Sequence, residues 1–458
     1  MTPLRRAAQI AEEHLGGLGE RRVGADIGYE DVLAALDAPL PEEGEDAVAV
    51  IEELAAVAGP GTVASPGPRY FGFVTGGALP AALAADWLVS TWDQNGFGRT
   101  SSPAAAAIEA TAERWVLEAL DLPRDAAVGF VTGATAGNLV GLLAARHRVL
   151  AREGWDAEAD GLIGAPPVRV LVGEEVHTSL LKALRMAGLG AARAVRVPVD
   201  GNGAMRADAL AEALAAARGP AIVCAQAGNV NTGASDPLRE VVAAVRDHGG
   251  WVHVDGAFGL WAAASPAFRH LVDGAEGADS WAVDGHKWLN VPYDSGLAIV
   301  ADRDAVRGAL GATASYLQLG AGREPFEYVP EMSRRARAIP VYAALRSLGR
   351  SGMAELVERC CAHARRLAAA MDALDGAQVL NEVVLNQVLV RFDDDAITRG
   401  VAEEVQRDGE AWLGGTEWRG RAAVRVSVSN WSTTGEDVDR LAAALERALT
   451  AVRAGAHA

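Results

Sequence analysis

The spacing of hydrophobic positions changes partway along this chain. From about residue 126 onward, short apolar runs alternate with longer segments in which apolar and polar positions repeat at helical spacing. Short apolar runs are typical of buried strands, and the longer segments are typical of helices. We predict strands at Ala127–Val131, Val168–Val172, Ala221–Ala225, Trp251–Asp255, Ser280–Val283 and Gly296–Val300, and helices that include Leu139–Arg152, Met205–Ala217 and Leu238–His248. This alternation predicts a mostly parallel, doubly wound sheet with helices on both faces.

The N-terminal segment follows another pattern. The first 60 or so residues are acidic and helical in pattern, and they end in two Pro/Gly clusters, Gly59–Gly61 and Ser65–Pro68. Such clusters mark a connection between separate parts of a chain. We therefore predict an N-terminal helical arm at residues 1–65 and a large domain at residues 66–345.

Past Leu345, a long alanine-rich helix precedes isolated strands near Val383–Phe392 and Ala422–Val428. A final helix is predicted to begin at Thr433–Glu436, where a Thr and a Glu three residues apart match a capping box. These elements predict a smaller C-terminal α/β domain at residues 346–458.

Composition narrows the class of protein. Half of the 458 residues are hydrophobic and 22% are charged, which is typical of a globular protein with a large core. The formal net charge of −18 disfavours nucleic acid as a partner, because phosphate binding needs clustered Lys and Arg. No apolar run approaches the roughly 18 residues of a membrane helix, and the first 24 residues lack the apolar core of a signal peptide.

The three cysteines, Cys224, Cys360 and Cys361, are too few for a disulfide framework, and their spacing is not that of metal ligands. A reducing compartment suits such a chain. We therefore expect a cytoplasmic protein without a bound metal or a membrane anchor.

Two residues with reactive side chains follow two of the predicted strands. Asp255 ends one apolar run, and Lys287, between His286 and Trp288, lies 32 residues later, just after another. The carboxyl ends of parallel strands meet at one edge of a sheet, so both groups can reach one site. This pairing suits pyridoxal phosphate, whose aldehyde forms an imine with an amine and whose pyridine nitrogen is kept protonated by an acid. For either residue alone, a surface lysine or a strand-end aspartate remains the alternative.

A glycine-rich segment, Gly129–Leu139, runs from a predicted strand into a predicted helix. Its small residues let the backbone approach an anion, and a helix start offers free N–H groups and the positive end of the helix dipole. The segment lacks the spacing and the lysine of a Walker loop. It is a candidate phosphate site or an ordinary strand-to-helix turn.

His177 directly follows another predicted strand. An imidazole at that place can stack on a pyridine ring, or it can simply cap a helix. His286, next to Lys287, has the same ambiguity, with phosphate binding as its candidate role.

Taken together, these segments resemble the group II pyridoxal-phosphate-dependent amino-acid decarboxylases, a family that includes aromatic-amino-acid and glutamate decarboxylases. The resemblance extends from about Tyr70 to Asp437. It is carried by Pro80–Ala84, Ser102–Pro103, Thr132–Asn138, His177–Ser179, His253–Asp255, His286–Trp288 and Arg425–Ser427. The resemblance implies a type I aminotransferase-like fold, with a seven-stranded, mostly parallel, doubly wound sheet, a smaller C-terminal α/β domain and an N-terminal helical arm.

The resemblance also implies roles for the residues that match the family's cofactor site. Lys287 would be the Schiff-base lysine, and Asp255 would be the partner of the pyridine nitrogen. His177 would stack on one face of the ring, and Ala257 would pack against the other. The phosphate would be surrounded by Gly133, Ala134, Thr135, Asp284 and His286. Asn229 stands where relatives often have a threonine near the ring hydroxyl, and this departure leaves its role open.

In this family a tyrosine on a loop over the active site is thought to return a proton to the substrate carbon. Tyr328 falls in this part of the chain, and Tyr316 competes with it because the match there needs a gap. Either tyrosine could instead pack against a domain interface. Phe97 matches a segment that reaches the partner subunit's site in relatives. Thr75 matches a position near the substrate carboxylate, and Arg425 matches an arginine near the cofactor or that carboxylate.

The reaction that the resemblance implies is decarboxylation of an L-amino acid to an amine, in a homodimer with active sites at the interface. An aminotransferase, an oxygen-dependent decarboxylating oxidase that forms an aldehyde, another lyase and a regulator that binds pyridoxal without turnover remain alternatives. Trp92, Phe97 and Trp288 hint at an apolar pocket, although aromatic residues are more often core. Aromatic, branched and small aliphatic substrates all stay open.

Overall fold

The computed structural model describes residues 1–216, 218–312 and 322–456. The chain forms two compact units. The larger unit comprises Ala78–Ala362 and Asn381–Gln387, and the smaller unit comprises Met1–Gly77, His363–Leu380 and Val388–Ala458. The division into an arm and two domains at residues 65 and 345 stays a prediction.

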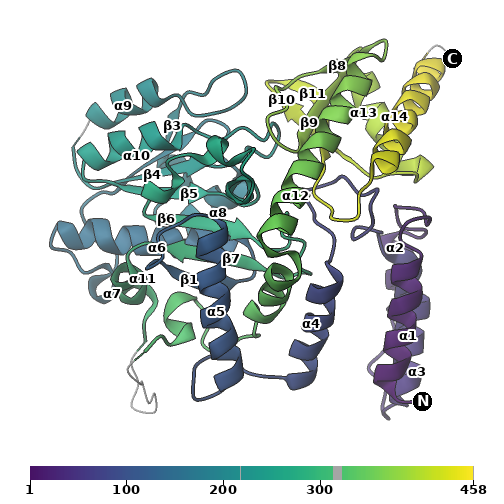
Figure 1. Ribbon diagram of the computed structural model, residues 1–458, viewed down its shortest axis with the longest axis horizontal. Helices are drawn as coiled ribbons and strands as arrows, with labels where there is room; N and C mark the ends of the chain where they lie inside the picture. Colours follow the sequence, from purple (N-terminus) through teal and green to yellow (C-terminus); the bar gives the residue numbers. More distant parts are fainter. Residues whose placement is uncertain (217, 313–321, 457–458) are drawn as a thin grey trace. The chain divides into compact units, whose positions relative to one another are not determined.

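The larger unit carries a seven-stranded sheet in the order β1-β7-β6-β5-β4-β2-β3 (Figure 1). Its strands are β1 (Ala127–Val131), β2 (Arg169–Gly173), β3 (Val195–Val197), β4 (Ala221–Gln226), β5 (Trp251–Asp255), β6 (Ser280–Asp284) and β7 (Gly296–Val300). Strand β7 runs antiparallel to both of its neighbours, β1 and β6, and the other pairings are parallel. The mostly parallel sheet predicted from the apolar runs is therefore confirmed.

Six of these strands match the predicted ones to within one residue at each end. Strand β3 was missed because it has three residues at the edge of the sheet, two of them exposed, and so leaves no apolar run.

The larger unit also contains helices and short 3-10 turns. They are α4 (Pro80–Trp92), α5 (Pro103–Ala119), α6 (Ala134–Arg152), α7 (Ala157–Asp160), α8 (Thr178–Met186), α9 (Ala207–Ala215), α10 (Leu238–Asp247) and α11 (Arg303–Leu310), with 3-10 turns η2 (Ala191–Arg193), η3 (Gly259–Ala264), η4 (Arg269–Val272), η5 (Ala275–Gly277) and η6 (Pro325–Tyr328). Helix α12 (Ala338–Asp372) begins in this unit, and its regular backbone is interrupted at Gly349, where φ is 61°.

Helix α6 packs across β5, β6 and β7, and glycines permit the close approach. A Cβ at Gly137 would lie 2.8 Å from the Leu297 carbonyl oxygen, and one at Gly141 would lie 2.5 Å from His253 Nδ1. The helix begins five residues before the predicted Leu139, because its first turn consists of small residues without a hydrophobic repeat.

The smaller unit combines helices with a second sheet in the order β10-β11-β9-β8. Its elements are α1 (Pro3–Gly16), α2 (Tyr29–Leu36), α3 (Ala47–Ala58), η1 (Gly59–Gly61), β8 (Ala377–Val379), β9 (Gln387–Phe392), α13 (Asp395–Asp408), β10 (Gly414–Trp418), β11 (Arg421–Ser427) and α14 (Gly435–Ala456). Helix α13 packs against α14 and β11, and α1 packs along α3 (Figure 1).

The predicted capping box of the last helix was wrong by one residue. Asp437 Oδ2 accepts hydrogen bonds from the Thr434 N–H and hydroxyl, at 2.9 and 2.7 Å, while the Asp437 N–H donates back to Thr434 Oγ1 at 3.3 Å. Thr433 instead donates its hydroxyl to the Pro68 carbonyl oxygen. The sequence allows a capping box of Thr433 with Glu436 or of Thr434 with Asp437. The hydrogen bond from Thr433 to Pro68 leaves Thr434 to form the box with Asp437.

Across the described chain, no helix combines the length and the apolar character needed to cross a membrane.

Candidate active site

All strands of the large sheet except β7 run in the same direction, and the segments at the carboxyl ends of five of them, β1, β2, β4, β5 and β6, carry the candidate residues. Helix α6 begins just after β1, His177 follows β2 and Asn229 follows β4. Asp255 and Asp284 are the last residues of β5 and β6, and Lys287 lies three residues beyond Asp284. In an open α/β sheet this edge is where ligands bind.

Lys287 forms an ion pair at this edge. Its Nζ lies 3.0 Å from Asp284 Oδ2, and the two side chains are 18% and 4% exposed. The other oxygen, Oδ1, accepts a 2.5 Å hydrogen bond from the Ala134 N–H, the first amide of α6, and lies 3.4 Å from His286 Nε2. As a carboxylate, Asp284 has no donor to offer a phosphate, so its contacts support a role toward the lysine.

His286 is held in place from two sides. Its Nδ1 accepts a 3.1 Å hydrogen bond from the Ser295 N–H, and its ring stacks on Tyr293 with 4.3 Å between ring centroids. Burial lowers the pKa of His286, which nearby Asp284 only partly offsets. A Cβ at Gly133 would come within 3.0 Å of this imidazole. Gly133 therefore lets the start of α6 and the histidine lie side by side.

Asp255 is buried, and both of its oxygens accept hydrogen bonds. Oδ2 accepts from Asn138 Nδ2 at 3.0 Å, and Oδ1 accepts from the Ala257 N–H at 3.3 Å. Asn138 Oδ1 in turn lies 2.8 Å from His253 Nε2. The carboxylate is thus fixed from the helix α6 side and from its own strand.

His177 caps helix α8. Its Nδ1 accepts a 3.2 Å hydrogen bond from the Ser179 N–H and lies 2.7 Å from Ser179 Oγ. A nitrogen that accepts a backbone N–H carries no proton of its own, which assigns the ring proton to Nε2. The capping role considered for His177 is present, and it fixes the plane of a half-buried imidazole.

Asn229 offers a buried donor. Its Oδ1 accepts hydrogen bonds from the Asn231 and Thr232 N–H groups, at 2.8 and 3.2 Å. Its Nδ2 is buried and has no hydrogen-bond partner within the described chain. A buried amide N–H without a partner is costly, and it is often a sign of a ligand or water that completes the site. Thr135, the second residue of α6, is half-buried.

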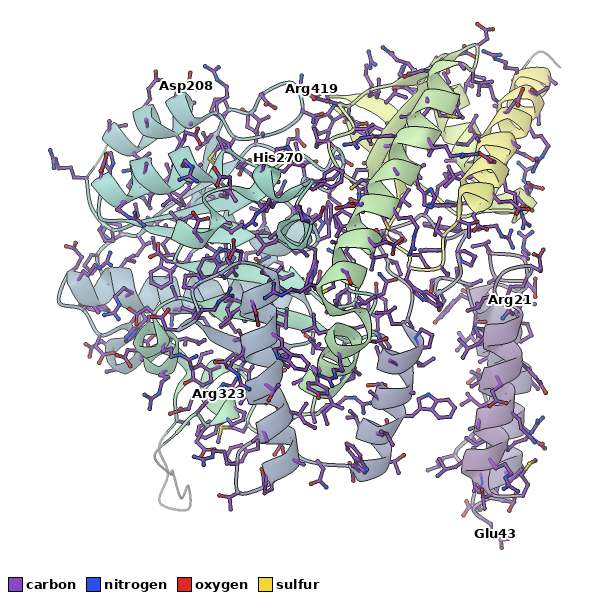
Figure 2. All side chains as sticks on the ribbon, viewed as in Figure 1. Arg21, Glu43, Asp208, His270, Arg323 and Arg419 are labelled. Carbon is purple, nitrogen blue, oxygen red and sulfur yellow. The ribbon has the colours of Figure 1, made fainter. Side chains whose placement is uncertain are left out.

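Tyr328 is buried in η6. Guanidinium carbons of Arg323 and Arg303 lie 4.9 and 5.9 Å from its ring centroid. Arg323, labelled in Figure 2, also pairs with Glu109 on α5 at 2.9 Å. These contacts pack Tyr328 within the larger unit, and both its proton-donor role and its packing against a domain interface stay predictions. Its competitor Tyr316 lies outside the described residues.

The remaining sequence candidates fall in different places. Phe97 is half-buried and stacks on Phe326 with 4.8 Å between centroids. Thr75 and Arg425 belong to the smaller unit, where Thr75 is buried and burial lowers the pKa of Arg425. Trp288 is buried in the core near Phe258, as aromatic residues more often are, and a role for it in an apolar pocket stays a prediction.

Sequence reasoning assigned no role to Asn138, His253 or Ser280, although all three touch the surroundings of Asp255. His253 carried a signal, because it lies two residues before Asp255 and alternation places both on one face of β5. Nothing in the sequence alone connected His253 or Asp255 to Asn138, which is 115 residues from His253.

A protein-family model described as the pyridoxal-dependent decarboxylase conserved domain matches residues 30–393. The chain belongs to this decarboxylase family. The decarboxylase is 28% identical over 421 residues to tryptophan decarboxylase 1 of Oryza sativa subsp. japonica, across 83% of this chain and 80% of that protein. It is 31% identical over 403 residues to a tyrosine decarboxylase of the same plant, across 81% of this chain and 72% of that protein.

The fold of the decarboxylase matches a solved structure throughout its length. The crystal structure of Oryza sativa TDC with PLP and tryptamine superimposes with a TM-score of 0.91, at 24% identity, over 98% of this chain and 97% of that one. The family and fold class predicted from the sequence are confirmed. The decarboxylase is therefore a carboxy-lyase that uses pyridoxal phosphate to decarboxylate an amino acid.

Proposed function

We propose that Lys287 carries the pyridoxal phosphate of this decarboxylase, and that the enzyme converts an L-amino acid to the corresponding amine and carbon dioxide. One observation carries the proposal: an amine, a buried carboxylate and a helix N-terminus follow strands β6, β5 and β1 at one edge of the sheet. These are the three groups that the aldehyde, the pyridine nitrogen and the phosphate of the cofactor need.

The residues present fit this cofactor. Lys287 is one of two lysines in the chain, the other being Lys182, among 42 basic residues that are otherwise all arginine. Arginine is always protonated and cannot form an imine, so a lysine retained at this place favours amine chemistry over a simple ion pair. The buried Nδ2 of Asn229 supplies a donor for the ring hydroxyl, in the position where relatives have a threonine.

Bound pyridoxal phosphate supplies an aldehyde for the substrate amine and an electron-poor ring that takes up the electrons left when carbon dioxide departs. The chain's own groups hold that ring. Asp255 would accept the N–H of the pyridine nitrogen, and His177 and Ala257 would hold the ring between them. The start of α6, with Gly133, Ala134 and Thr135, would bind the phosphate together with the imidazole of His286.

The decarboxylation itself breaks the bond between the substrate's α-carbon and its carboxylate and adds one proton to that carbon. Two tyrosines are candidates for the proton donor, Tyr328 and Tyr316. The ring of Tyr328 packs near the guanidinium groups of Arg323 and Arg303. Replacing each tyrosine in turn by phenylalanine shows which one is the proton donor. Loss of the donor should lower kcat and leave binding of the cofactor unchanged.

We propose an aromatic L-amino acid as the substrate, since tryptophan and tyrosine decarboxylases are among the relatives. Thr75 and Arg425 are our candidates for the substrate carboxylate, and Phe97 is a candidate for its side chain. A panel of single amino acids tests this assignment. Greater activity toward 2,4-diaminobutyrate than toward tryptophan, tyrosine and phenylalanine would overturn it.

We propose that the active form is a homodimer in which the N-terminal helices pack on the partner. Helices α1, α2 and α3 have no buried residue in the single chain, and apolar side chains on them remain exposed. They include Leu4, Leu33, Leu36, Val50 and Leu54. Exposed apolar surface of this kind is typical of an interface. A fully active monomer in analytical ultracentrifugation would contradict the proposal.

We also propose a cytoplasmic location. Cys224, Cys360 and Cys361 are free and buried, which suits a reducing compartment. Cell fractionation with a tagged chain tests this, and recovery in a secreted or periplasmic fraction would contradict it.

The experiment that tests the function is borohydride reduction of the protein with bound pyridoxal phosphate, followed by peptide mass spectrometry. Because the chain has two lysines, the cofactor should be trapped on the peptide with Lys287 and not on that with Lys182. Lys287→Ala should abolish trapping and activity, and the matched variant Lys182→Ala should change neither. Products complete the test: amine and carbon dioxide support the proposal, whereas a 2-oxo acid, or an aldehyde with peroxide, would make the enzyme an aminotransferase or an oxidase.

A further inference from the structure

Four side chains form a continuous line of hydrogen bonds that ends on Asp255. Trp251 Nε1 lies 2.9 Å from Ser280 Oγ, which lies 2.9 Å from His253 Nδ1. His253 Nε2 lies 2.8 Å from Asn138 Oδ1, and Asn138 Nδ2 lies 3.0 Å from Asp255 Oδ2. We call these five residues the Asp255 relay. All five are buried, although they come from β5, β6 and α6.

The chemistry at the two ends sets the direction of every bond in the relay. An indole N–H can only donate and a carboxylate can only accept. Trp251 therefore donates to Ser280, whose hydroxyl donates on to His253 Nδ1. At the other end Asn138 must turn its NH₂ group to Asp255, which leaves its oxygen to accept from His253 Nε2–H. Each donor thus points toward Asp255.

The relay requires a neutral His253 with its proton on Nε2, and the packing provides for this. Burial lowers the pKa of His253 to about 3, so the ring stays neutral near pH 7. Helix α6 makes room for the ring at Gly141, where a Cβ would lie 2.5 Å from His253 Nδ1 and 3.2 Å from Ser280 Oγ. A buried polar line of this length is costly unless each member is satisfied, and here each hydrogen bond is made.

We propose that His253 and Asn138 are positioning residues for the pyridine nitrogen of the cofactor. They act through Asp255: the directed hydrogen bond from Asn138 stops the carboxylate from rotating and presents it as an acceptor to the ring N–H. The inference rests on the proposed function, because it takes Asp255 to be the partner of that nitrogen. A preorganised acceptor contributes more to catalysis than one that must reorient.

Two cofactors that differ at one atom test the proposal. Pyridoxal phosphate has the ring nitrogen, and its 1-deaza analogue has a C–H group there. The dissociation constants of both are measured by fluorescence titration on the full chain. In His253→Met and in Asn138→Ala, affinity for pyridoxal phosphate should fall about tenfold to a hundredfold, the size of a lost hydrogen bond to a charged group. Affinity for the analogue should change by less than about threefold, because it makes no such bond.

Rescue and control variants complete the design. His253→Gln keeps an N–H donor on a side chain of similar reach, so it should restore most of the preference for pyridoxal phosphate. Ser265→Ala is the matched control, because it removes a part-buried hydrogen bond from a buried serine to Glu358, outside the relay. It should leave the ratio of the two affinities unchanged.

An independent measurement uses the cofactor-free protein. Nitrogen-15 NMR at neutral pH should show His253 with its proton on Nε2 and a bare Nδ1. A proton on Nδ1 would overturn the proposal, as would an equal loss of affinity for both cofactors in His253→Met, which indicates packing alone. Failure of the proposed function would give a different result. Pyridoxal phosphate would not be trapped on Lys287 of the unmodified protein, and the positioning role of His253 and Asn138 would then be overturned as well.

Discussion

Lys287 Nζ lies 3.0 Å from Asp284 Oδ2, while the other oxygen of that carboxylate accepts a hydrogen bond from the Ala134 N–H. Asp284 thereby joins the lysine at the sheet edge to the positive end of helix α6. Both are places where the proposed cofactor would bind, one to its aldehyde and one to its phosphate. The Asp284 carboxylate therefore stabilises this edge of the sheet in the cofactor-free protein, and it competes with the phosphate for the N–H groups at the start of α6.

Replacing Asp284 with asparagine should tighten the binding of pyridoxal phosphate. The asparagine side chain would keep an oxygen for the Ala134 N–H and would remove the negative charge near the phosphate. We expect the dissociation constant to fall about threefold to tenfold, from the roughly 1 kcal/mol that a charge at a helix N-terminus contributes. Equilibrium dialysis measures it. Asp294→Asn, in the same loop but paired with Arg337, is the control and should change nothing. Weaker binding in Asp284→Asn would show that the carboxylate serves the cofactor directly.

Gly296→Ala should displace the start of helix α6, where the phosphate is proposed to bind. A Cβ at Gly296 would lie 2.3 Å from the Gly133 Cα and 2.6 Å from its carbonyl carbon, and backbone atoms cannot yield as a flexible side chain does. We expect a loss of about 1–3 kcal/mol in the free energy of unfolding, together with weaker cofactor binding, because strand β7 and the start of α6 must separate. Urea unfolding checks the stability. Gly201→Ala, where nothing lies within 4 Å of the new Cβ, should stay within about 0.5 kcal/mol of the original.

Arg334→Met should be strongly destabilising. Arg334 Nη2 lies 2.6 Å from Glu109 Oε2, and these side chains are 0% and 3% exposed. Removing Arg334 leaves the buried charge of Glu109 with less compensation. A loss of about 3–5 kcal/mol in the free energy of unfolding is typical of such a change. Arg350→Met removes an ion pair with Glu118 whose side chains are 69% and 46% exposed, and it should cost less than about 1 kcal/mol. Equal shifts of the urea midpoint in the two variants would contradict this account of the buried pair.

Stability should depend on the protonation of His253 in acid. Its pKa is lowered by burial from 6.5 to about 3, so below pH 6.5 the unfolded chain binds a proton that the folded chain does not. The contribution of this residue is present above pH 6.5 and is lost progressively as the pH falls toward 3. Between pH 7 and pH 5 the original protein should lose about 2 kcal/mol more than His253→Gln, which has no imidazole.

Urea unfolding of both proteins at the two pH values measures this difference. Other titrating groups act on both proteins alike. Asp236, for example, has its pKa raised by burial to about 6 and works in the opposite direction, gaining stability as the pH falls below that value. An identical pH dependence in the two proteins would contradict a neutral buried His253.

The sequence by itself determined the main sheet and the residues at its edge. Strands that are covered on both faces leave uninterrupted apolar runs, and for this reason β1, β4, β5, β6 and β7 could be located almost to the residue. Asp255 and Lys287 stood out because one ends such a run and the other lies shortly after one. The short strands β3, β8 and β10 were not found, since three to five partly exposed residues carry no such signal.

The tertiary structure alone decided which side chains meet at that edge. The capping pair of α14, the ion pair between Lys287 and Asp284, and the packing of Tyr328 against two arginines each depended on a choice among chemically similar neighbours. The Asp255 relay is the clearest case, because Asn138 and His253 are 115 residues apart and meet through the register of β5 and the close approach of α6. Local patterns specify the elements, but contacts between distant elements depend on register and packing, which are set only when the whole core assembles.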